Sequence, residues 1–503
     1  MEPEPPNHQV VYSEAVRNDL KRLTRRARDH GLAREMLIAL RAIDEALRDN
    51  LCEMSSCLSE TNRDAKSQAG PWRTWSRKPS RMFTRVQARH YRCLKWLDQP
   101  LGRFHALVGP NASGKSTFLD VLELLSDLMF TRGDVHETLL PRSSSFVDLL
   151  WKGCGSKFQV AVEAKVPETI AKKMAEDKRT KYDSVRYEIA FGLDEDLGEV
   201  GIDHEEFWLT KQPARPVVRQ RLFFPEVHAG AGADLFQGRG RGRKLAIKKK
   251  PGGNDNFYTE GKETFMPSFR LGRTRSALAN VPVNPDSFPV SLWFRGLLET
   301  GVQRLVLATE SLRRPSPPGL GPHFRPDGWN LPWVVEALRT GNPQGFQEWL
   351  KHVRTSLEDI LDIITIEREE DRHRYLVIEY KNGAKVPSWL VSDGTLRLLA
   401  LTIIAYLKTS NTVYLIEEPE NGVHPRAIET VVQSLSSIYK GQVLMATHSP
   451  VTINLLALDQ VLCFAKDEEG AADAVSGDYH PALKEWKRGD PDLGVLFATG
   501  ILS

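Results

Sequence analysis

The chain has 503 residues, of which 41% are hydrophobic, so it can bury large cores and is expected to form roughly two to four domains. Lys and Arg total 68 against 65 for Asp and Glu, and this balance excludes a strongly basic or acidic protein. Five scattered cysteines, never spaced as C-x-x-C, argue against a disulfide framework or a zinc ribbon and favour a reducing, cytoplasmic compartment. The longest strongly apolar stretch, Leu398 to Leu407, is too short to span a bilayer.

The N-terminal part of the chain predicts a helical extension and a linker. Apolar residues recur at helical spacing from Ser13 to about Asn50, with Gly31 as a break, which indicates two helices. The stretch from Ser55 to Ser80 is polar and contains glycine and prolines, as is typical of a linker. We expect these helices to lie outside the catalytic core.

A glycine-rich segment follows the apolar run Phe104–Val108 and precedes a helical pattern that starts at Phe118. It consists of Gly109, Pro110, Asn111, Ala112, Ser113, Gly114, Lys115, Ser116 and Thr117. The spacing G-x-x-x-x-G-K-[ST] lets backbone N–H groups wrap a polyphosphate at the positive end of a helix. We expect the segment to bind ATP, with Lys115 on the β- and γ-phosphates and the Ser116 hydroxyl on Mg²⁺.

The middle of the chain predicts a strand-rich layer. Alternating patterns at 158–162, 185–189 and 217–224 indicate strands, with a helix at about 168–178 between them. Residues 228–285, rich in Gly, Pro, Asn and charge, predict a mobile loop. Its basic cluster consists of Arg239, Arg241, Arg243, Lys244, Lys248, Lys249 and Lys250. Two interpretations of this cluster stay open, a solvated loop or a surface that binds nucleic-acid phosphates.

Helical patterns return at 290–310 and 332–360. Strands are predicted at 363–367 and 375–380, with a turn just after the second. The sequence shows no internal repeat.

A short β-branched and apolar run, Thr412–Ile416, ends in Glu417 and Glu418. Beside a phosphate loop, carboxylates at the end of a buried strand suit Mg²⁺ and water. We assign Glu417 to the metal, through its water shell, and Glu418 to orienting and deprotonating the attacking water. The alternative is that both residues only cap the following helix near Arg426.

Two further segments carry polar residues that would join this site. The predicted strand Gln442–Ala446 precedes His448, which either donates to the γ-phosphate at the carboxyl edge of the sheet or has only a structural role. Val391–Thr395 opens a predicted helix at 396–407, and an N-cap explains Ser392 without any function.

Four motifs in this order, GPNASGKST, VSDGTLRLLAL, VYLIEEPENGVHP and VLMATHSP, closely resemble the ATP-binding-cassette (ABC) type ATPases of the RecF, SMC and OLD (overcoming lysogenization defect) branch. The segment Asp327–Pro332 also resembles a stretch that recurs in bacterial AAA members of that branch. The resemblance covers about residues 82–503. It implies an α/β fold: an ABC-type P-loop ATPase head, with a mixed sheet flanked by helices. A long α+β insertion would separate the phosphate loop, or Walker A motif, from the signature motif.

The resemblance implies that VSDGT stands for the family's LSGGQ signature, with Ser392 and Gly394 presented to the γ-phosphate held by a second subunit. Asp393 then occupies the position of the first signature glycine, and Thr395 that of the glutamine. Glu417 replaces the usual Walker B aspartate. Two composite sites for ATP and Mg²⁺ would close across a homodimer, or within a higher oligomer.

The expected organisation has four parts. Residues 1–80 form the N-terminal extension and linker, and 81–150 form an ATPase lobe with the phosphate loop. An inserted strand-rich and helical region covers 151–385 and includes a basic loop at 238–250. Residues 386–503 form the ATPase lobe with the signature, the acidic strand and the switch histidine.

The resemblance favours a cytoplasmic ATPase that senses or regulates in a multi-subunit bacterial system, with anti-phage defence as the expected setting. The chain has no long heptad coiled coil, so an SMC-type rod is not expected. No Toprim nuclease domain fits after His448, so a separately encoded effector, such as a nuclease, would act as the partner. The alternative is a RecF-like DNA-binding repair clamp. The long insert and the Glu-Pro-Glu continuation of the acidic strand disfavour a transporter subunit.

Overall fold

The computed structural model describes residues 82–502 except 175–181, 195, 197, 212–220, 227–233, 237, 239, 241, 251, 262–265, 408–410 and 484–492. The predicted N-terminal helices and linker lie outside the described residues. Contacts divide the chain into two units, and the elements below belong to the larger, Pro79–Gly494, except most of α13 (Leu493–Ala498). Among the described residues, no helix is long and apolar enough to cross a membrane.

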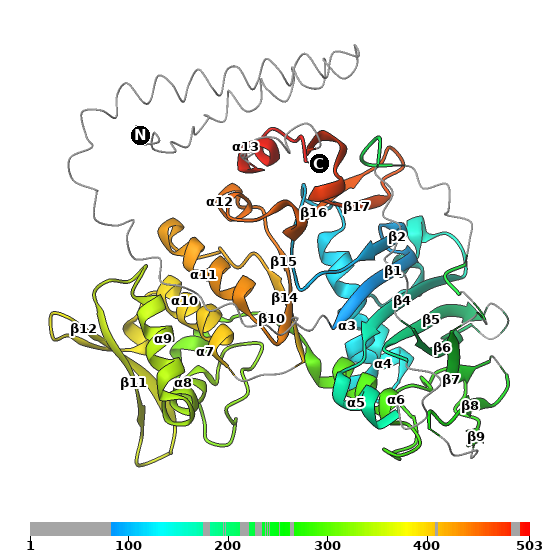
Figure 1. Ribbon diagram of the computed structural model, residues 1–503, viewed down its shortest axis with the longest axis horizontal. Coiled ribbons are helices and arrows are strands. Elements are labelled where there is room, and N and C mark those ends of the chain that lie inside the picture. Colours follow the sequence, from blue (N-terminus) through cyan, green and yellow to red (C-terminus); the bar gives the residue numbers. More distant parts are fainter. Residues whose placement is uncertain are drawn as a thin grey trace, which may run out of the picture. The chain divides into compact units, whose positions relative to one another are not determined.

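A six-stranded sheet carries the phosphate loop, in the order β10-β14-β15-β3-β16-β17 (Figure 1). Its strands are β3 (Phe104–Val108), β10 (Val302–Leu305), β14 (Thr412–Glu417), β15 (Gly441–Ala446), β16 (Val461–Lys466) and β17 (Ala472–Ser476). The first five strands in this order, β10, β14, β15, β3 and β16, run parallel, and β17 is antiparallel to β16. Every residue of β3 is buried, which explains why four of its five residues are apolar and only His105 is polar.

A second, antiparallel sheet has eight strands in the order β2-β1-β4-β5-β6-β7-β8-β9. They are β1 (Phe83–Tyr91), β2 (Leu94–Pro100), β4 (Lys157–Lys165), β5 (Ser184–Asp194), β6 (Glu199–Thr210), β7 (Arg243–Lys249), β8 (Asp255–Phe257) and β9 (Ser268–Phe269). In β5, apolar residues such as Tyr187 and Ile189 alternate with Arg186 and Glu188, and all are buried. The polar face of this strand is therefore buried as ion pairs, in which Arg186 contacts both Glu163 and Glu188.

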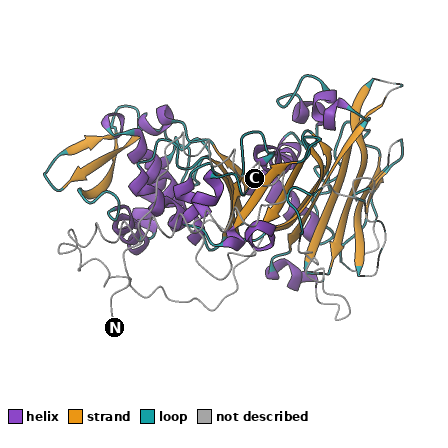
Figure 2. Ribbon diagram, turned by 90° about the horizontal axis from the view of Figure 1, so that it is seen from above, coloured by secondary structure: helices purple, strands orange, loops and turns teal. Residues whose placement is uncertain are grey.

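Helix α3 (Lys115–Phe130) lies in a core that both sheets share. Its buried Phe118 and Leu122 belong to one hydrophobic cluster with Tyr187 of the eight-stranded sheet and Leu415 of the six-stranded sheet. Figure 2 shows helices between the strands of these two sheets. Full burial of a Leu or Phe side chain contributes about 1.5–3 kcal/mol relative to exposure, so this burial is the main interaction that holds α3 in place.

The remaining elements are shorter helices and a third sheet. The helices are α4 (Val135–Leu139), α5 (Glu168–Met174), α6 (Pro289–Gly296), α7 (Thr309–Arg313), α8 (Leu331–Gly341), α9 (Pro343–Val353), α10 (Asp393–Ile403), α11 (Pro425–Ser437) and α12 (Pro450–Asn454). Strands β11 (Ile360–Glu367), β12 (Arg374–Tyr380) and β13 (Lys385–Pro387) pair in that order. Helix α10, which the signature segment opens, packs against α7, α9 and α11.

The predicted basic loop is wrong in its central part, because strand β7 forms there and pairs with β6. Lys249 is buried and lies 2.8 Å from Asp255, and Lys248 pairs with Glu206. These carboxylates lie on neighbouring strands, so the lysines neutralise charge inside the sheet. The two arginines that precede the strand in the cluster, at 239 and 241, lie outside the described residues.

The predicted helix at 290–310 is formed only as far as residue 301, by α6 and a π-helical turn (Leu297–Gly301). It is wrong beyond that point, where β10 and then α7 follow. A Cβ on Gly301 would lie 2.8 Å from the backbone oxygen of Asn411, so the chain passes closely there as it enters the sheet. Pairing with β14 stabilises β10 as a strand, although its local sequence fits a helix.

The predicted helix at 332–360 is divided into α8 and α9. The side chain of Asn342 accepts the Gly345 N–H at 3.2 Å and caps α9, and Pro343 occupies the first turn. The predicted strand at 217–224 is not formed in its described part, residues 221–224.

The buried carboxylate of Glu205, in β6, fixes the segment around Ser276 against the eight-stranded sheet. It accepts hydrogen bonds from Ser276 Oγ at 2.7 Å, Ala277 N–H at 2.7 Å, Leu278 N–H at 2.9 Å and Tyr187 OH at 2.9 Å. These donors have no access to water once the sheet is covered. Their satisfaction therefore depends on one side chain.

We expect Glu205→Ala to lower the free energy of unfolding by about 3 kcal/mol or more, because several buried donors lose their acceptor. Chemical denaturation measures the change. Glu199→Ala is the control, since Glu199 is exposed at the start of the same strand and should change stability little. Equal stability of the two variants would contradict this role of Glu205.

Candidate ATP site

The carboxyl ends of three parallel strands meet at one level of the six-stranded sheet. In its register, Leu107 pairs with Ala446, and Ala446 pairs with Glu417. The alignment extends beyond the strands, because Glu418 N–H donates to Ala446 O at 2.8 Å and Thr447 N–H donates to Leu107 O at 3.1 Å. The phosphate loop, the two glutamates and the THSP segment therefore leave the sheet at one edge, where open α/β sheets bind ligands.

The phosphate loop makes a sharp connection between β3 and α3. A Cβ on Gly109 would lie 2.2 Å from the backbone oxygen of Phe464, so only glycine fits there. Gly114 has a φ of 106°, and a Cβ on it would lie 2.7 Å from the Cβ of Ala472. Ser116, in the first turn of α3, is exposed. The close backbone, the helix N-terminus and the free hydroxyl fit a phosphate group and Mg²⁺.

Lys115 is folded back onto its own loop. Its Nζ donates to Gly109 O at 2.9 Å and to Pro110 O at 2.8 Å, and Ser113 Oγ lies at 3.4 Å. Burial lowers the pKa of Lys115 to about 8, while the charges of the two glutamates after β14 act in the opposite direction. A phosphate would give this ammonium group a charged hydrogen-bond acceptor, which is a stronger partner than these uncharged oxygens.

Glu417 and Glu418 are half-buried at the end of β14. Arg304 of β10 links Glu417 to α3: its Nη2 lies 3.2 Å from Glu417 Oε1 and its Nη1 lies 2.8 Å from Glu123 Oε2. Glu418 has a φ of 48°, a left-handed conformation that is strained for a residue with a Cβ, and it accepts a hydrogen bond from Asn421 Nδ2. The surrounding structure thus fixes the direction of both carboxylates.

His448 follows β15 and is half-buried. Its backbone N–H donates to Glu420 Oε1 at 3.3 Å, and Thr447 Oγ1 donates to the same oxygen at 2.5 Å. Burial and then the charge of Lys115 lower the pKa of His448, while Glu418 and Glu420 oppose the shift. A neutral imidazole still has one N–H to donate. The structure brings this ring within electrostatic reach of Lys115 and Glu418.

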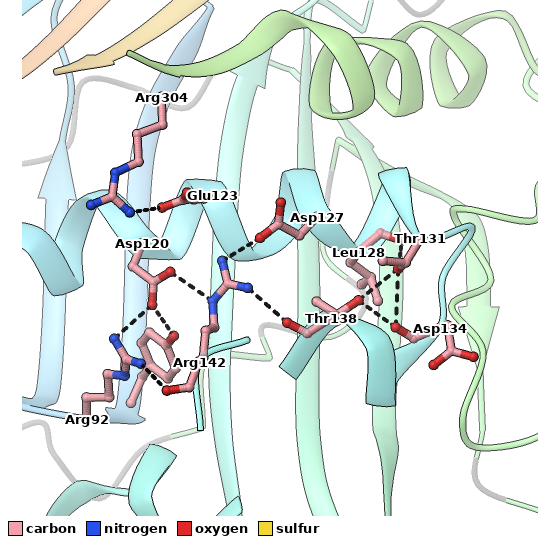
Figure 3. Close-up of polar contacts among 11 residues, drawn as sticks. Arg92, Asp120, Glu123, Asp127, Leu128, Thr131, Asp134, Thr138, Arg142 and Arg304 are labelled. Carbon is pink, nitrogen blue, oxygen red and sulfur yellow. Dashed lines mark hydrogen bonds and ion pairs between the residues drawn. The ribbon is translucent and has the colours of Figure 1, made fainter. Parts of the chain in front are cut away.

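Ion pairs fix the helix that follows the phosphate loop (Figure 3). Asp120 of α3 accepts a hydrogen bond from Tyr91 OH, and it pairs with Arg142 Nε at 2.8 Å and Arg92 Nη1 at 3.2 Å. Arg142 also lies 2.9 Å from Asp127, farther along the helix. The side chains of Arg142 and Asp120 are only 7% and 11% exposed, so removing either would leave the other as a buried charge without this partner. This network holds α3 in orientation through Asp120 and Asp127.

The signature segment begins α10, with Ser392 as its N-cap. Ser392 Oγ accepts the Thr395 N–H at 3.3 Å and lies 2.9 Å from Thr395 Oγ1, yet Ser392 remains exposed. A Cβ on Gly394 would lie 2.4 Å from the backbone oxygen of Gly422, in the loop after β14. The N-cap interpretation of Ser392 therefore holds, and the segment packs against the loop that follows the acidic strand.

The segment Asp327–Pro332 packs against the stretch of chain that runs from β10 to α7. Its backbone accepts a hydrogen bond from Ala308 N–H at 3.3 Å, through the oxygen of Asp327. A Cβ on Gly328 would lie 2.6 Å from Leu312 Cδ2, so the turn packs directly on α7. This motif has a structural role among the described residues, because it supports the chain between β10 and α7.

Sequence reasoning missed Arg304 and Arg313. Arg313 Nη2 lies 2.6 Å from Asp393 Oδ1 and donates to Val391 O at 3.2 Å. Arg304 falls in the stretch 290–310 that was predicted as a helix, and Arg313 lies just after it, so neither was placed near a site. The local sequence of β10, Val-Gln-Arg-Leu, gives no signal that could have indicated a strand.

A group of potential metal ligands lies in the eight-stranded sheet, where atoms of Glu188, His204 and Glu206 lie within 4.8 Å of one another. Arg186 Nε already donates to Glu188, and Lys248 Nζ donates to Glu206. Because a cation neutralises each carboxylate, this group is an ion-pair cluster of the sheet and does not fit a metal site.

A family model described as "AAA domain, putative AbiEii toxin, Type IV TA system" matches residues 104–454, more than two thirds of the chain. The chain belongs to this family of P-loop ATPases. An OLD nuclease of Thermus scotoductus is 46% identical over 44 residues, which is 9% of this chain and 8% of that protein.

Three solved structures of SMC heads are similar to the chain at low sequence identity. An SMC head bound to the C-winged helix domain of ScpA has a TM-score of 0.44 and 13% identity, over 79% of this chain and 97% of that chain. A Pyrococcus furiosus SMC head domain, bound to the C-terminal domain of ScpA, has a TM-score of 0.42 and 13% identity, over 81% and 100% of the two chains. The SMC head domain of Thermotoga maritima has a TM-score of 0.37 and 11% identity, over 79% and 99%.

We expect Lys115→Ala to weaken ATP binding by about 30-fold or more, because a buried charged partner of the phosphates is lost. Calorimetric titration with ATP and Mg²⁺ measures the affinity. Lys351→Ala is the control, since Lys351 is exposed on α9. Unchanged affinity in Lys115→Ala would contradict the ATP site.

Proposed function

We propose that this chain hydrolyses ATP with Mg²⁺, dimerises when ATP is bound, and regulates a separately encoded effector. The observation that carries this proposal is the common edge at which the phosphate loop, Glu417, Glu418 and His448 leave the six-stranded sheet. Family membership supports an ATPase, and the geometry provides a group for each part of the reaction.

The residues of this edge have distinct proposed roles. Lys115 binds the β- and γ-phosphates, and Ser116 and Glu417 would hold Mg²⁺, which neutralises phosphate charge when bound. Glu418, whose backbone strain and contact with Asn421 fix its direction, orients and deprotonates the attacking water. His448 donates an imidazole N–H to the γ-phosphate.

The signature residues Ser392 and Gly394 are proposed to serve the ATP of a second copy of the chain. The exposure of Ser392 at the N-terminus of α10 supports this role, because the positive end of a helix favours an anion. Gly394 also packs on Gly422, in the loop that follows Glu418. A movement of Glu418 during hydrolysis in one site would therefore be transmitted, through a direct backbone contact, to the signature segment that serves the other site.

The setting that we propose is an anti-phage or toxin system in bacteria. The family description names a putative AbiEii toxin and a type IV TA system, and the short matched segment belongs to an OLD nuclease. Both support a defence role for this chain. The alternative of a DNA repair clamp loses support among the described residues, because Lys248 and Lys249 of the basic cluster are engaged in ion pairs.

We expect Glu418→Gln to retain ATP binding and to slow hydrolysis by about a hundredfold or more, since a positioned base contributes that much. Phosphate release measures turnover. ATP should then produce more dimer than in the wild type, as measured by light scattering. Glu429→Gln, which changes an exposed residue of α11, is the control and should behave as the wild type.

In the Glu418→Gln background, Ser392→Arg should abolish the additional dimer, because a bulky side chain would fill the surface that faces the second ATP. A monomer at every ATP concentration, or a dimer that forms without ATP, would contradict the composite site.

We expect the purified chain to hydrolyse ATP without cutting DNA or RNA. We also expect co-purification to yield a stoichiometric protein partner whose binding changes in the Glu418→Gln variant. Nuclease assays with Mg²⁺ and Mn²⁺, and co-purification with the products of neighbouring genes, check both statements. Nuclease activity that persists in Lys115→Ala would contradict the regulator role. ATP hydrolysis that depends on DNA and needs no partner would favour the repair clamp.

A further inference from the structure

The signature segment carries a negative charge where the proposed function requires an anion to bind. Asp393 is the first residue of α10, directly between Ser392 and Gly394, and its side chain is 47% exposed. A carboxylate there stabilises the helix N-terminus of the free chain. The same charge repels the γ-phosphate of a second chain's ATP, since both groups are negative.

Arg313 of α7 lies against this carboxylate. Its Nη2 is 2.6 Å from Asp393 Oδ1, and the same nitrogen donates to Val391 O at 3.2 Å. One guanidinium group therefore contacts the backbone before Ser392 and the side chain after it. The Arg313 side chain is 40% exposed, so the pair lies at the surface of the molecule.

The position of Arg313 is set by neighbouring elements. Its backbone oxygen accepts a hydrogen bond from Ser388 Oγ at 2.9 Å, which ties α7 to the chain that leads into the signature. On the other side, Leu312 packs under the turn at Gly328, where a Cβ would lie 2.6 Å from it. Arg397 of α10 donates to Leu307 O at 3.2 Å and joins the same two segments again.

The neighbouring Arg314 makes no contact with Asp393 that matches that of Arg313. Arg314 directly follows α7, its side chain is 69% exposed, and it pairs with Glu310 of that helix. Arg313 and Arg314 share one charge type and one helix end, but only Arg313 reaches the signature.

We propose that Arg313 is a positioning residue that neutralises Asp393, so that the signature can accept the ATP phosphate of a second copy of this chain. The inference rests on the proposed composite site. It assigns Arg313 to dimer closure and leaves ATP binding within one chain to the phosphate loop.

The test uses the full chain with a non-hydrolysable ATP analogue and Mg²⁺, and analytical ultracentrifugation measures the dimer dissociation constant. Arg313→Gln should weaken the dimer by about tenfold or more, because both symmetric sites lose a charge interaction. Arg313→Gln combined with Asp393→Asn should restore the dimer to within about threefold of Asp393→Asn alone, because the charge to be neutralised is absent. Arg314→Gln should leave the constant unchanged.

Analogue binding to the dilute monomer should be the same in all four variants. Unchanged analogue binding also shows that Arg313→Gln still folds.

The outcomes separate this inference from the function on which it rests. If the unmodified chain stays monomeric with the analogue, the composite site and this inference are both wrong. If the unmodified chain dimerises and Arg313→Gln dimerises equally well, only the role of Arg313 is wrong. If the combined variant is as weak as Arg313→Gln, Arg313 acts otherwise than by neutralising Asp393, and the inference is again overturned.

Discussion

The parallel pairing of β15 with β3 and with β14 is the constraint on which the candidate site depends. It brings Leu107 level with Ala446 and Glu417, although these residues are far apart in the sequence. Successive side chains of a strand point to opposite faces, so a shift of one residue would turn Glu417 away from α3. In β14 the residues Thr412–Ile416 are buried and Glu417 is half-buried at the end, so a shift that moved Glu417 into the sheet would bury its charge.

Charge at the candidate site is balanced within the free chain by contacts that a phosphate and a cation would replace. Lys115 is held by uncharged oxygens of its own loop, and Arg304 lies between Glu417 and Glu123. Glu418 is directed by its strained backbone. A phosphate would replace the loop oxygens as the partner of Lys115, and a cation would compete with Arg304 for Glu417, whereas Glu418 needs no such exchange with a basic side chain.

The stretch from β10 to α7 joins the acidic strand to the signature. β10 pairs with β14, the chain after it hydrogen-bonds to the turn at Asp327, and α7 then presents Arg313 to Asp393. Gly394 closes the loop by packing on Gly422, which follows β14. A displacement at the end of β14 thus has two contiguous physical connections to the signature, one through packed segments and one through backbone contact.

The sequence by itself determined the phosphate loop and the acidic strand, because local spacing defines both: glycines for a tight turn before a helix, and carboxylates after an apolar run. It also indicated that the chain is an α/β P-loop ATPase, which family membership confirms. Only the tertiary structure decided that Val302–Leu305 is a strand, since its stability comes from β14, more than a hundred residues away. The same holds for Lys249, whose partner Asp255 turns a basic loop into a buried strand, and for Arg313, whose partner Asp393 lies in another helix. Local propensity cannot report such contacts, because the free energy that fixes them comes from groups that meet only after the chain has folded.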